Sequence, residues 1–276
     1  MIIFLCNVFM FLDLSQLHRQ QDMKLDTAGW SIWDISVVTD TRLLVTVWRV
    51  RKVSLVDSQT GGTVAHITLE HEPVRVCMLD NNTAVVTLDG HKLQFINIDG
   101  DSLTLGQPIS VSGDVWGIAR SDEVLVVSYL SSPWLEVLSK NGIVLHSFDN
   151  QAVGSSVFKW PTFISISADN MIYVSDEDTS TITQLDSYLR ITKTFSDPIL
   201  QGPCGIISLS ADQVLVCSCY NNRILLLSPS TGVITSILDQ QDGIEGPWAL
   251  TFSPSQRKLY VVPNELSGRV QVYQQQ

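Results

Sequence analysis

Hydrophobic residues along this chain fall in short runs of Val, Ile, Leu and Thr, which are separated by Gly, Pro, Asn and Asp. From Trp30 onward, apolar residues almost never recur at the i, i+3, i+4, i+7 spacing of an amphipathic helix. Short β-branched runs bounded by turn residues are typical of strands. The pattern therefore predicts an all-β protein.

The strand-like runs recur at a regular interval. Their central residues are separated by 41, 40, 47, 43 and 44 positions, which is the length of a four-stranded propeller blade. A second set of apolar residues keeps the same register seven to nine positions upstream. The central residues are Leu44, Val85, Leu125, Ile172, Leu215 and Leu259, and the upstream residues are Ile35, Val76, Ile118, Ile164, Ile206 and Leu250. Six repeats predict a six-bladed β-propeller of four-stranded antiparallel blades.

The sixth repeat lacks a fourth strand after the segment 269–273. Residues 20–25 stand where a fourth strand stands in the other repeats. We expect them to pair beside 269–273, which would close the ring with an N-terminal strand and cover an exposed edge. The expected organisation is an apolar N-terminal segment, residues 1–16, followed by the propeller, residues 17–276.

Composition supports a folded protein whose strands are covered on both faces. Hydrophobic residues make up 45% of the chain and charged residues only 16%, the opposite of a disordered protein. The longest apolar run, residues 1–14, is interrupted by Asn7 and Asp13 and is shorter than the ~20 residues of a membrane-spanning helix. We therefore expect no membrane span, and blades that cover one another explain the low charge.

Net charge and cysteine content bear on partners and compartment. The formal charge of -11 disfavours broad electrostatic binding to nucleic acid or to an anionic membrane. Five scattered cysteines, an odd number, favour free thiols and a cytoplasmic location. The alternative is a secreted protein in which residues 1–16 are a signal peptide; a further alternative is that they are a non-native start.

Repeats four and five contain the segments Ile172-Tyr173-Val174-Ser175-Asp176 and Val214-Leu215-Val216-Cys217-Ser218-Cys219-Tyr220-Asn221-Asn222-Arg223-Ile224. These segments resemble the NHL repeat, whose pattern is Pro-x-Gly-Ile, then Val-x-Asp, then Asn-x-Arg-Ile. Residues 20 to 273 also resemble the C-terminal propellers of invertebrate tripartite-motif proteins. The resemblance implies a propeller that recognises substrates or other proteins, normally joined to a RING, a B-box and a coiled coil that supply ubiquitin-ligase activity and oligomerisation.

The chain lacks the clustered Cys and His of a RING or B-box. Ligase activity and oligomerisation would therefore need domains outside this sequence. Other catalytic signatures are also missing, including Gly-x-Ser-x-Gly, the P-loop, Gly-x-Gly-x-x-Gly and Cys-x-x-Cys. These observations predict a non-enzymatic protein without a cofactor.

The innermost strand of each repeat places one residue toward the channel. In order, these residues are Asp34, Arg75, Gly117, Phe163, Gly205 and Ala249. One carboxylate and no histidine predict no channel metal, and the simplest interpretation of Asp34 and Arg75 is an ion pair between adjacent blades. The competing hypothesis is a propeller hydrolase with a channel metal near Asp34.

One position earlier, three of the six repeats carry tryptophan: Trp33, Trp116 and Trp248. Exposed aromatic residues around a channel are typical of interaction hot spots; the alternative is that they pack between blades as core. The predicted binding residues on this face are Trp33, Asp34, Arg75, Trp116, Phe163, Trp248, Trp48, Tyr129, Asp176 and Tyr220. The expected partner is a protein or peptide, and the mixed charge makes single-stranded RNA a weaker alternative.

Overall fold

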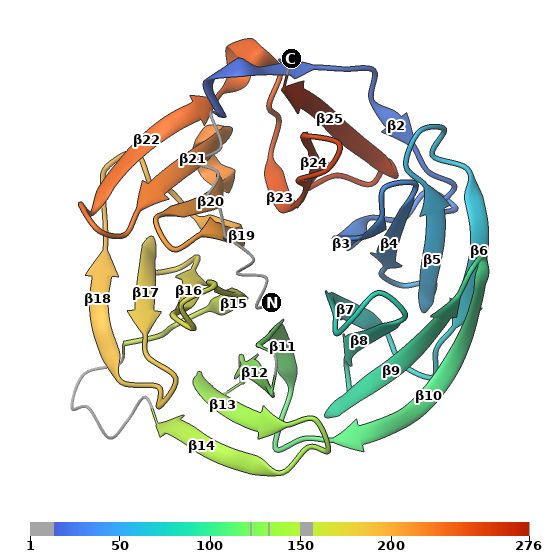
Figure 1. Cartoon of the computed structure of the whole chain (residues 1–276), viewed down its shortest axis with the longest axis horizontal. Helices are drawn as coiled ribbons and strands as arrows, with labels where there is room; N and C mark the ends of the chain where they lie inside the picture. Colours follow the sequence, from blue (N-terminus) through green and yellow to red (C-terminus); the bar gives the residue numbers. More distant parts are fainter. Residues whose placement is uncertain (1–13, 122, 132, 150–156, 276) are drawn as a thin grey trace, which may run out of the picture.

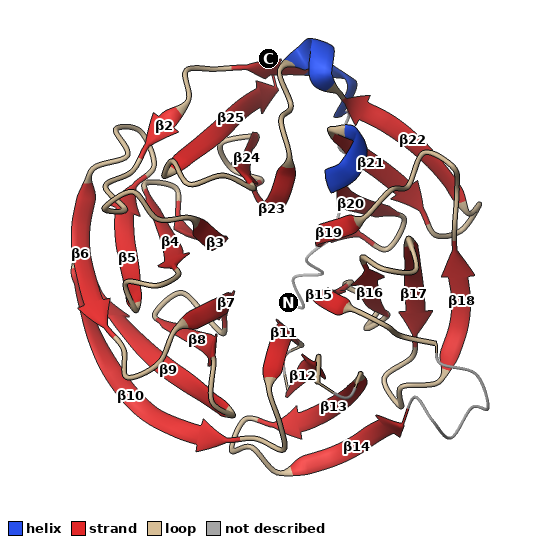
Figure 2. Ribbon diagram, turned by 180° about the vertical axis from the view of Figure 1, so that it is seen from behind, coloured by secondary structure: helices blue, strands red, loops and turns tan. Residues whose placement is uncertain are grey.

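The computed structural model describes residues 14–121, 123–131, 133–149 and 157–275. Within them, six antiparallel sheets form a ring around a central channel (Figure 1). In each sheet the first strand faces the channel and the last strand lies on the outer rim, as the reverse view also shows (Figure 2). The predicted all-β, six-bladed propeller is confirmed.

Blades 1 to 5 each use four consecutive strands. The strands are β3 (Ile32–Thr39), β4 (Arg42–Val47), β5 (Lys52–Asp57) and β6 (Thr63–Thr68) in blade 1; β7 (Pro73–Met78), β8 (Thr83–Leu88), β9 (Lys92–Asp99) and β10 (Ser102–Ser110) in blade 2; β11 (Val115–Arg120), β12 (Val124–Tyr129), β13 (Trp134–Ser139) and β14 (Val144–Asp149) in blade 3; β15 (Pro161–Ile166), β16 (Ile172–Asp176), β17 (Thr181–Leu185) and β18 (Ile191–Phe195) in blade 4; and β19 (Pro203–Ser210), β20 (Gln213–Ser218), β21 (Arg223–Ser228) and β22 (Val233–Leu238) in blade 5.

The sixth blade joins both ends of the described chain. It contains β23 (Pro247–Ser253), β24 (Lys258–Pro263) and β25 (Arg269–Gln275). Two short strands, β1 (Leu17–Arg19) and β2 (Met23–Lys24), pair antiparallel with β25. Closure by an N-terminal strand is therefore confirmed, although pairing begins at Leu17 and is split in two. Of the predicted segment 1–16, residues 1–13 lie outside the described residues.

The core lies within and between the blades. Strands β8 and β20, each second in its blade, are buried almost along their full length, because neighbouring blades cover both faces. The outermost strand β6, by contrast, alternates between exposed and half-buried residues. This difference explains why the repeat was visible in the sequence as continuous apolar runs. No helix in the described ranges is long and apolar enough to cross a membrane.

Every innermost strand is irregular at its first residues. We call the face on which these strands begin the mouth face. The register of pairing shifts between Ile32 and Asp34, Pro73 and Val76, Val115 and Ile118, Pro161 and Phe163, Pro203 and Ile206, and Pro247 and Ala249. Four of the six begin with proline, which has no N–H to pair. Bulges of this kind redirect side chains, and here they do so around the channel.

A ring of buried hydroxyls joins neighbouring blades beside these bulges. In four blades, a Ser or Thr of the second strand donates to a carbonyl of the next blade's innermost strand. The pairs are Thr46 with Val74 O (3.2 Å), Thr87 with Trp116 O (3.0 Å), Ser128 with Pro161 O (2.8 Å) and Ser175 with Cys204 O (2.7 Å). Blade 6 contacts blade 1 through Trp248, whose Nε1 donates to Trp33 O at 3.1 Å. These contacts hold the mouth face together.

Candidate functional site at the channel mouth

Arg75 crosses the channel at the mouth face. Its side chain is 1% exposed. From blade 2 it reaches blade 1, where Nη1 donates to Trp33 O at 3.0 Å, and blade 4, where Nε donates to Thr162 O at 3.4 Å. The equivalent positions in three other blades are small: Gly117, Gly205 and Ala249. They leave the space that one long side chain occupies.

Four aromatic rings surround the guanidinium. The distances from Arg75 Cζ to the ring centroids are 3.6 Å for Phe163, 5.2 Å for Trp248, 5.7 Å for Trp116 and 5.9 Å for Trp33. Such contacts stabilise a cation that has lost its water. Burial lowers the pKa of Arg75 to about 10, so the group remains charged at neutral pH. Its Nη2 is buried and has no hydrogen-bond partner in the described structure.

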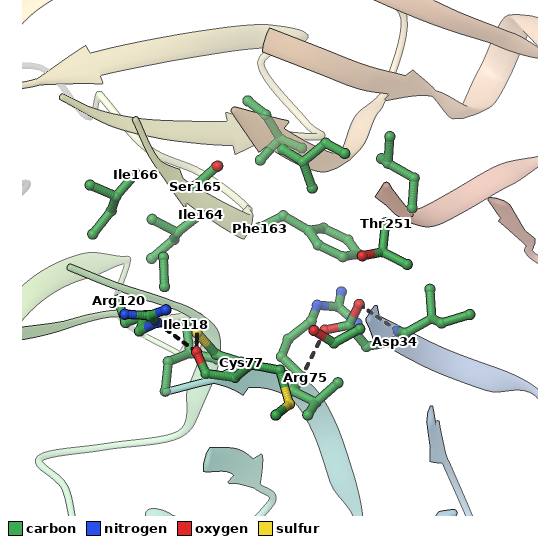
Figure 3. Close-up of a pocket in the computed structure, with 18 residues that line it drawn as sticks. Asp34, Arg75, Cys77, Ile118, Arg120, Phe163, Ile164, Ser165, Ile166 and Thr251 are labelled. Atoms are coloured by element: carbon green, nitrogen blue, oxygen red, sulfur yellow. Dashed lines mark hydrogen bonds between the residues drawn. The ribbon is translucent and has the colours of Figure 1, made fainter. Parts of the chain in front are cut away.

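Asp34 lies beside Arg75 in the channel (Figure 3). Its carboxylate accepts hydrogen bonds from the backbone N–H groups of Ile35 and Val76, both at 2.9 Å. Burial raises the pKa of Asp34 to about 6, against the lowering effects of Arg75 and of these two N–H groups. The expected ion pair is wrong in its geometry: within the described chain, no nitrogen of Arg75 lies within 4.0 Å of the carboxylate. Each group instead bonds to backbone.

Five tryptophans lie around this centre and form what we call the aromatic mouth: Trp30, Trp33, Trp48, Trp116 and Trp248. Each is partly exposed. Four of them are in ring contact through Trp33, and Trp30 is joined to Trp48 through Arg49. Ring centroids of Trp33 lie 4.5 Å from Trp48, 5.2 Å from Trp116 and 6.1 Å from Trp248. The indoles therefore pack on one another and still meet solvent, which is intermediate between the two alternatives that the sequence left open.

A basic hairpin turn borders the aromatic mouth. Arg49 is exposed, and its Cζ lies 4.8 Å from the ring centroid of Trp48 and 5.4 Å from that of Trp30. Arg51 lies in the same turn between β4 and β5, and Lys52 is the first residue of β5. This end of blade 1 thus carries local positive charge in an acidic protein.

The structure corrects two of the predicted binding residues. Tyr129 is fully buried; its hydroxyl donates to Glu136 Oε2 at 2.5 Å and its ring stacks on Trp134 at 4.3 Å. Asp176 is also fully buried, and it accepts from the backbone N–H groups of Lys159 and Trp160 at 2.7 and 3.0 Å. Both support loops and offer no surface to a partner.

Tyr220 is exposed, as expected. Its side chain is 64% accessible, and its hydroxyl donates to Glu177 Oε1 at 2.7 Å. This pair lies at the rim between blades 4 and 5, and the hydrogen bond to the carboxylate raises the pKa of Tyr220. Tyr220 is thus peripheral to the aromatic mouth.

Sequence reasoning missed three parts of this site: Trp30, Arg49 and the hydroxyl ring. The hydroxyl ring could have been predicted from the sequence, because its residues recur at the repeat interval, with separations of 41, 41 and 47. They are Thr46, Thr87, Ser128 and Ser175. The position of Arg49 could not have been predicted, since its stacking on two indoles depends on the shape of one turn. No group of three or more His, Cys, Asp or Glu suited to a metal occurs within the described ranges.

No protein-family model matches the chain, and no curated protein matches it by sequence. Solved structures are similar in fold. The virginiamycin B lyase of Staphylococcus aureus aligns with a TM-score of 0.67 and 14% identity, over 92% of this chain and 98% of that chain. A streptogramin B lyase aligns with a TM-score of 0.67 and 17% identity, over 93% and 87%. The propeller domain of Swd1 from Myceliophteria thermophila aligns with a TM-score of 0.63 and 12% identity, over 88% and 82%.

These similarities overturn the prediction that the chain is not an enzyme. Two of the similar structures are lyases built on the same propeller. The fold therefore hosts catalysis in those proteins, without requiring the motifs of other enzyme classes. At 14–17% identity the likeness shows the fold alone. The fold is also compatible with protein interaction, but the narrower resemblance to NHL and tripartite-motif propellers is not confirmed.

Proposed function

We propose that the aromatic mouth recognises a protein or peptide partner. The observation that carries the proposal is a partly exposed cluster of four contacting indoles from blades 1, 3 and 6, to which Trp30 is joined through Arg49. Tryptophan is enriched among residues that dominate binding energy. Four of these rings are already packed against one another, and the indole N–H of Trp248 is already hydrogen-bonded, so a partner would lose little of its binding energy to ordering them.

The charges around the aromatic mouth indicate the chemistry of the partner. Arg49 and Arg51 are exposed, whereas three acidic groups on the neighbouring blades already have partners. Those pairs are Glu70 with Lys92 at 2.9 Å, Asp114 with His91 at 2.7 Å, and Glu177 with Tyr220 at 2.7 Å. The expected partner segment carries an apolar side chain beside acidic residues, because complementary charge sets orientation and association rate.

The resemblance to tripartite-motif propellers adds a narrower proposal. If a RING-containing protein acts together with this chain, the segment bound at the aromatic mouth would belong to a ubiquitination substrate. Support for this step is limited to the NHL-like residues of repeats four and five. It depends on the binding proposal and is tested after it.

Binding can be tested with a peptide selected from a random library on the intact chain. Trp48→Ala and Trp116→Ala should each weaken that peptide, measured by calorimetry, by about 30-fold, as expected for hot-spot tryptophans. Arg49→Glu should slow association and reduce its salt dependence. The control is Tyr188→Ala, an exposed aromatic residue in the turn between β17 and β18. Unchanged affinity in both tryptophan variants would remove this face as the site.

A further inference from the structure

We propose a second site, below Arg75, that binds a small aliphatic carboxylate. A cavity of about 260 Å³ lies in the channel and is lined by residues from all six innermost strands (Figure 3). One end is formed by Arg75, Asp34 and Phe163, and the walls toward the other face are mostly aliphatic. A charged end and an apolar body are the features of a carboxylic acid with a short hydrocarbon chain.

The walls fit a hydrocarbon. The apolar residues that revealed the repeat all line this cavity: Ile35, Val76, Ile118, Ile164, Ile206 and Leu250. Polar atoms also line the cavity, including those of Ser36, Ser165 and Thr251, and the aliphatic side chains supply the surface that would accept an apolar guest. At roughly 30 Å³ for each water-sized unit, the volume holds a ligand of about nine non-hydrogen atoms.

The polar end lacks a partner that a carboxylate would supply. Nη2 of Arg75 is a buried donor without an acceptor in the described structure, and such a group costs free energy until it is paired. The guanidinium lies against the ring of Phe163 and beside the carboxylate of Asp34 (Figure 3). Nη2 has no surface that a water-sized atom can reach, so the guanidinium has to turn toward the cavity for a ligand carboxylate to form a charge-assisted hydrogen bond with it.

Asp34 makes this binding dependent on pH. A second carboxylate next to Asp34 favours its protonated form, so one proton is taken up as the ligand binds. The other charged or titratable residues that line the cavity are Arg75 and Cys77 of β7 and Arg120 of β11; β15, β19 and β23 contribute none to the lining. Burial raises the pKa of Cys77 to about 12. Of the lining groups, Asp34 is thus the one that titrates between pH 5 and 8.

The probe is 4-methylpentanoate, measured by calorimetry on the intact chain, with 4-methylpentan-1-ol as the matched neutral ligand. Since the pKa of Asp34 is about 6, the protonated fraction, and with it the affinity, should rise about 20-fold from pH 7.5 to 5.5. A free aliphatic carboxyl, like that of Glu, remains ionised over this range. Buffers of different ionisation enthalpy should report the uptake of one proton.

Two variants locate the site. Arg75→Met should weaken the acid at least tenfold and leave the alcohol unchanged, while Arg190→Met, a surface control, should change neither. Asp34→Asn should bind the acid at pH 7.5 as tightly as the wild type does at pH 5.5, without proton uptake. This second variant decides the matter if Arg75→Met does not fold, as judged by circular dichroism. Equal affinity for the acid and the alcohol, or no binding of the acid at either pH, would overturn the proposal.

Discussion

The two ends of the channel are built from the same six strands but differ in chemistry. At the mouth face, tryptophans, Arg75 and a ring of hydroxyls join the blades through hydrogen bonds and ring contacts. One residue further along each strand, the lining becomes Ile, Val and Leu around a cavity. Successive positions of one repeat thus form three layers: an indole layer, an Arg75 layer and an aliphatic layer.

This difference shows how a repeat fold acquires a site. The aliphatic layer is nearly the same in every blade, because packing around a symmetric channel favours similar volumes. The layer above it is asymmetric, with one arginine, one aspartate and one phenylalanine among small residues. The bulges at the start of each innermost strand allow this change without disturbing the blade below.

The largest expected effect concerns closure, on which both ends depend. Deleting residues 1–27 removes β1 and β2 and uncovers β25. The buried side chains of Leu17, Met23 and Leu25 each contribute about 1.5–3 kcal/mol, so the free energy of unfolding should fall by about 5 kcal/mol or more. Thermal denaturation should show a melting temperature lower by several degrees at least; an unchanged transition would contradict closure by this segment.

The second prediction concerns Asp34 in the Arg75 layer, which should make the stability of the protein depend on pH. The folded-state pKa of Asp34 is about 6, above the ordinary value of 3.8, so between these pH values the folded state holds more protons than the unfolded one. Its contribution to stability is therefore present below pH 4 and is lost as pH rises through 6, by about 3 kcal/mol. In denaturant titrations at several pH values, the free energy of unfolding of Asp34→Asn should not show this loss. Parallel pH profiles in wild type and variant would show that Asp34 is not buried as described.

The third prediction tests the hydroxyl ring. Thr87→Val leaves Arg75 N and Trp116 O without the hydroxyl that now bonds to both, and buried unpaired groups of this kind cost about 1–3 kcal/mol. Thr83→Val, at the other end of the same strand β8, is the control and should change stability by less than about 0.5 kcal/mol. Chemical denaturation measures both. If both variants lose the same free energy of unfolding, the hydrogen bonds of Thr87 do not stabilise the mouth face.

The smallest effect on stability is expected at the aromatic mouth itself. Trp48 is partly exposed and lies in the turn between β4 and β5. Trp48→Ala should reduce the free energy of unfolding by about 1 kcal/mol, through its contacts with Trp33 and Arg49. The same variant should abolish most partner binding. A variant that loses stability heavily would place this indole in the core rather than in a recognition surface.

Predictions from the sequence succeeded where the repeat itself carried the information. Trp33, Trp116 and Trp248 share one repeat position, and the structure brings them together. The approach failed where burial depends on a neighbouring loop: Tyr129 packs on Trp134, and Asp176 bonds to the N–H groups of the segment before β15. The prediction that the chain is not an enzyme is also overturned, because similar propellers include lyases and motifs of adjacent residues do not reveal a site assembled from separate blades.

The sequence by itself determined the blade, its repetition and the closing segment, because strands buried on both faces require apolar runs and each blade needs about 43 residues to cover the next. Only the tertiary structure decided what the channel contains. Arg75 bonds to carbonyl groups 42 and 87 residues away, and its unpaired Nη2 and the raised pKa of Asp34 arise from burial there. Such contacts depend on the closed ring, since no segment of the chain holds them alone.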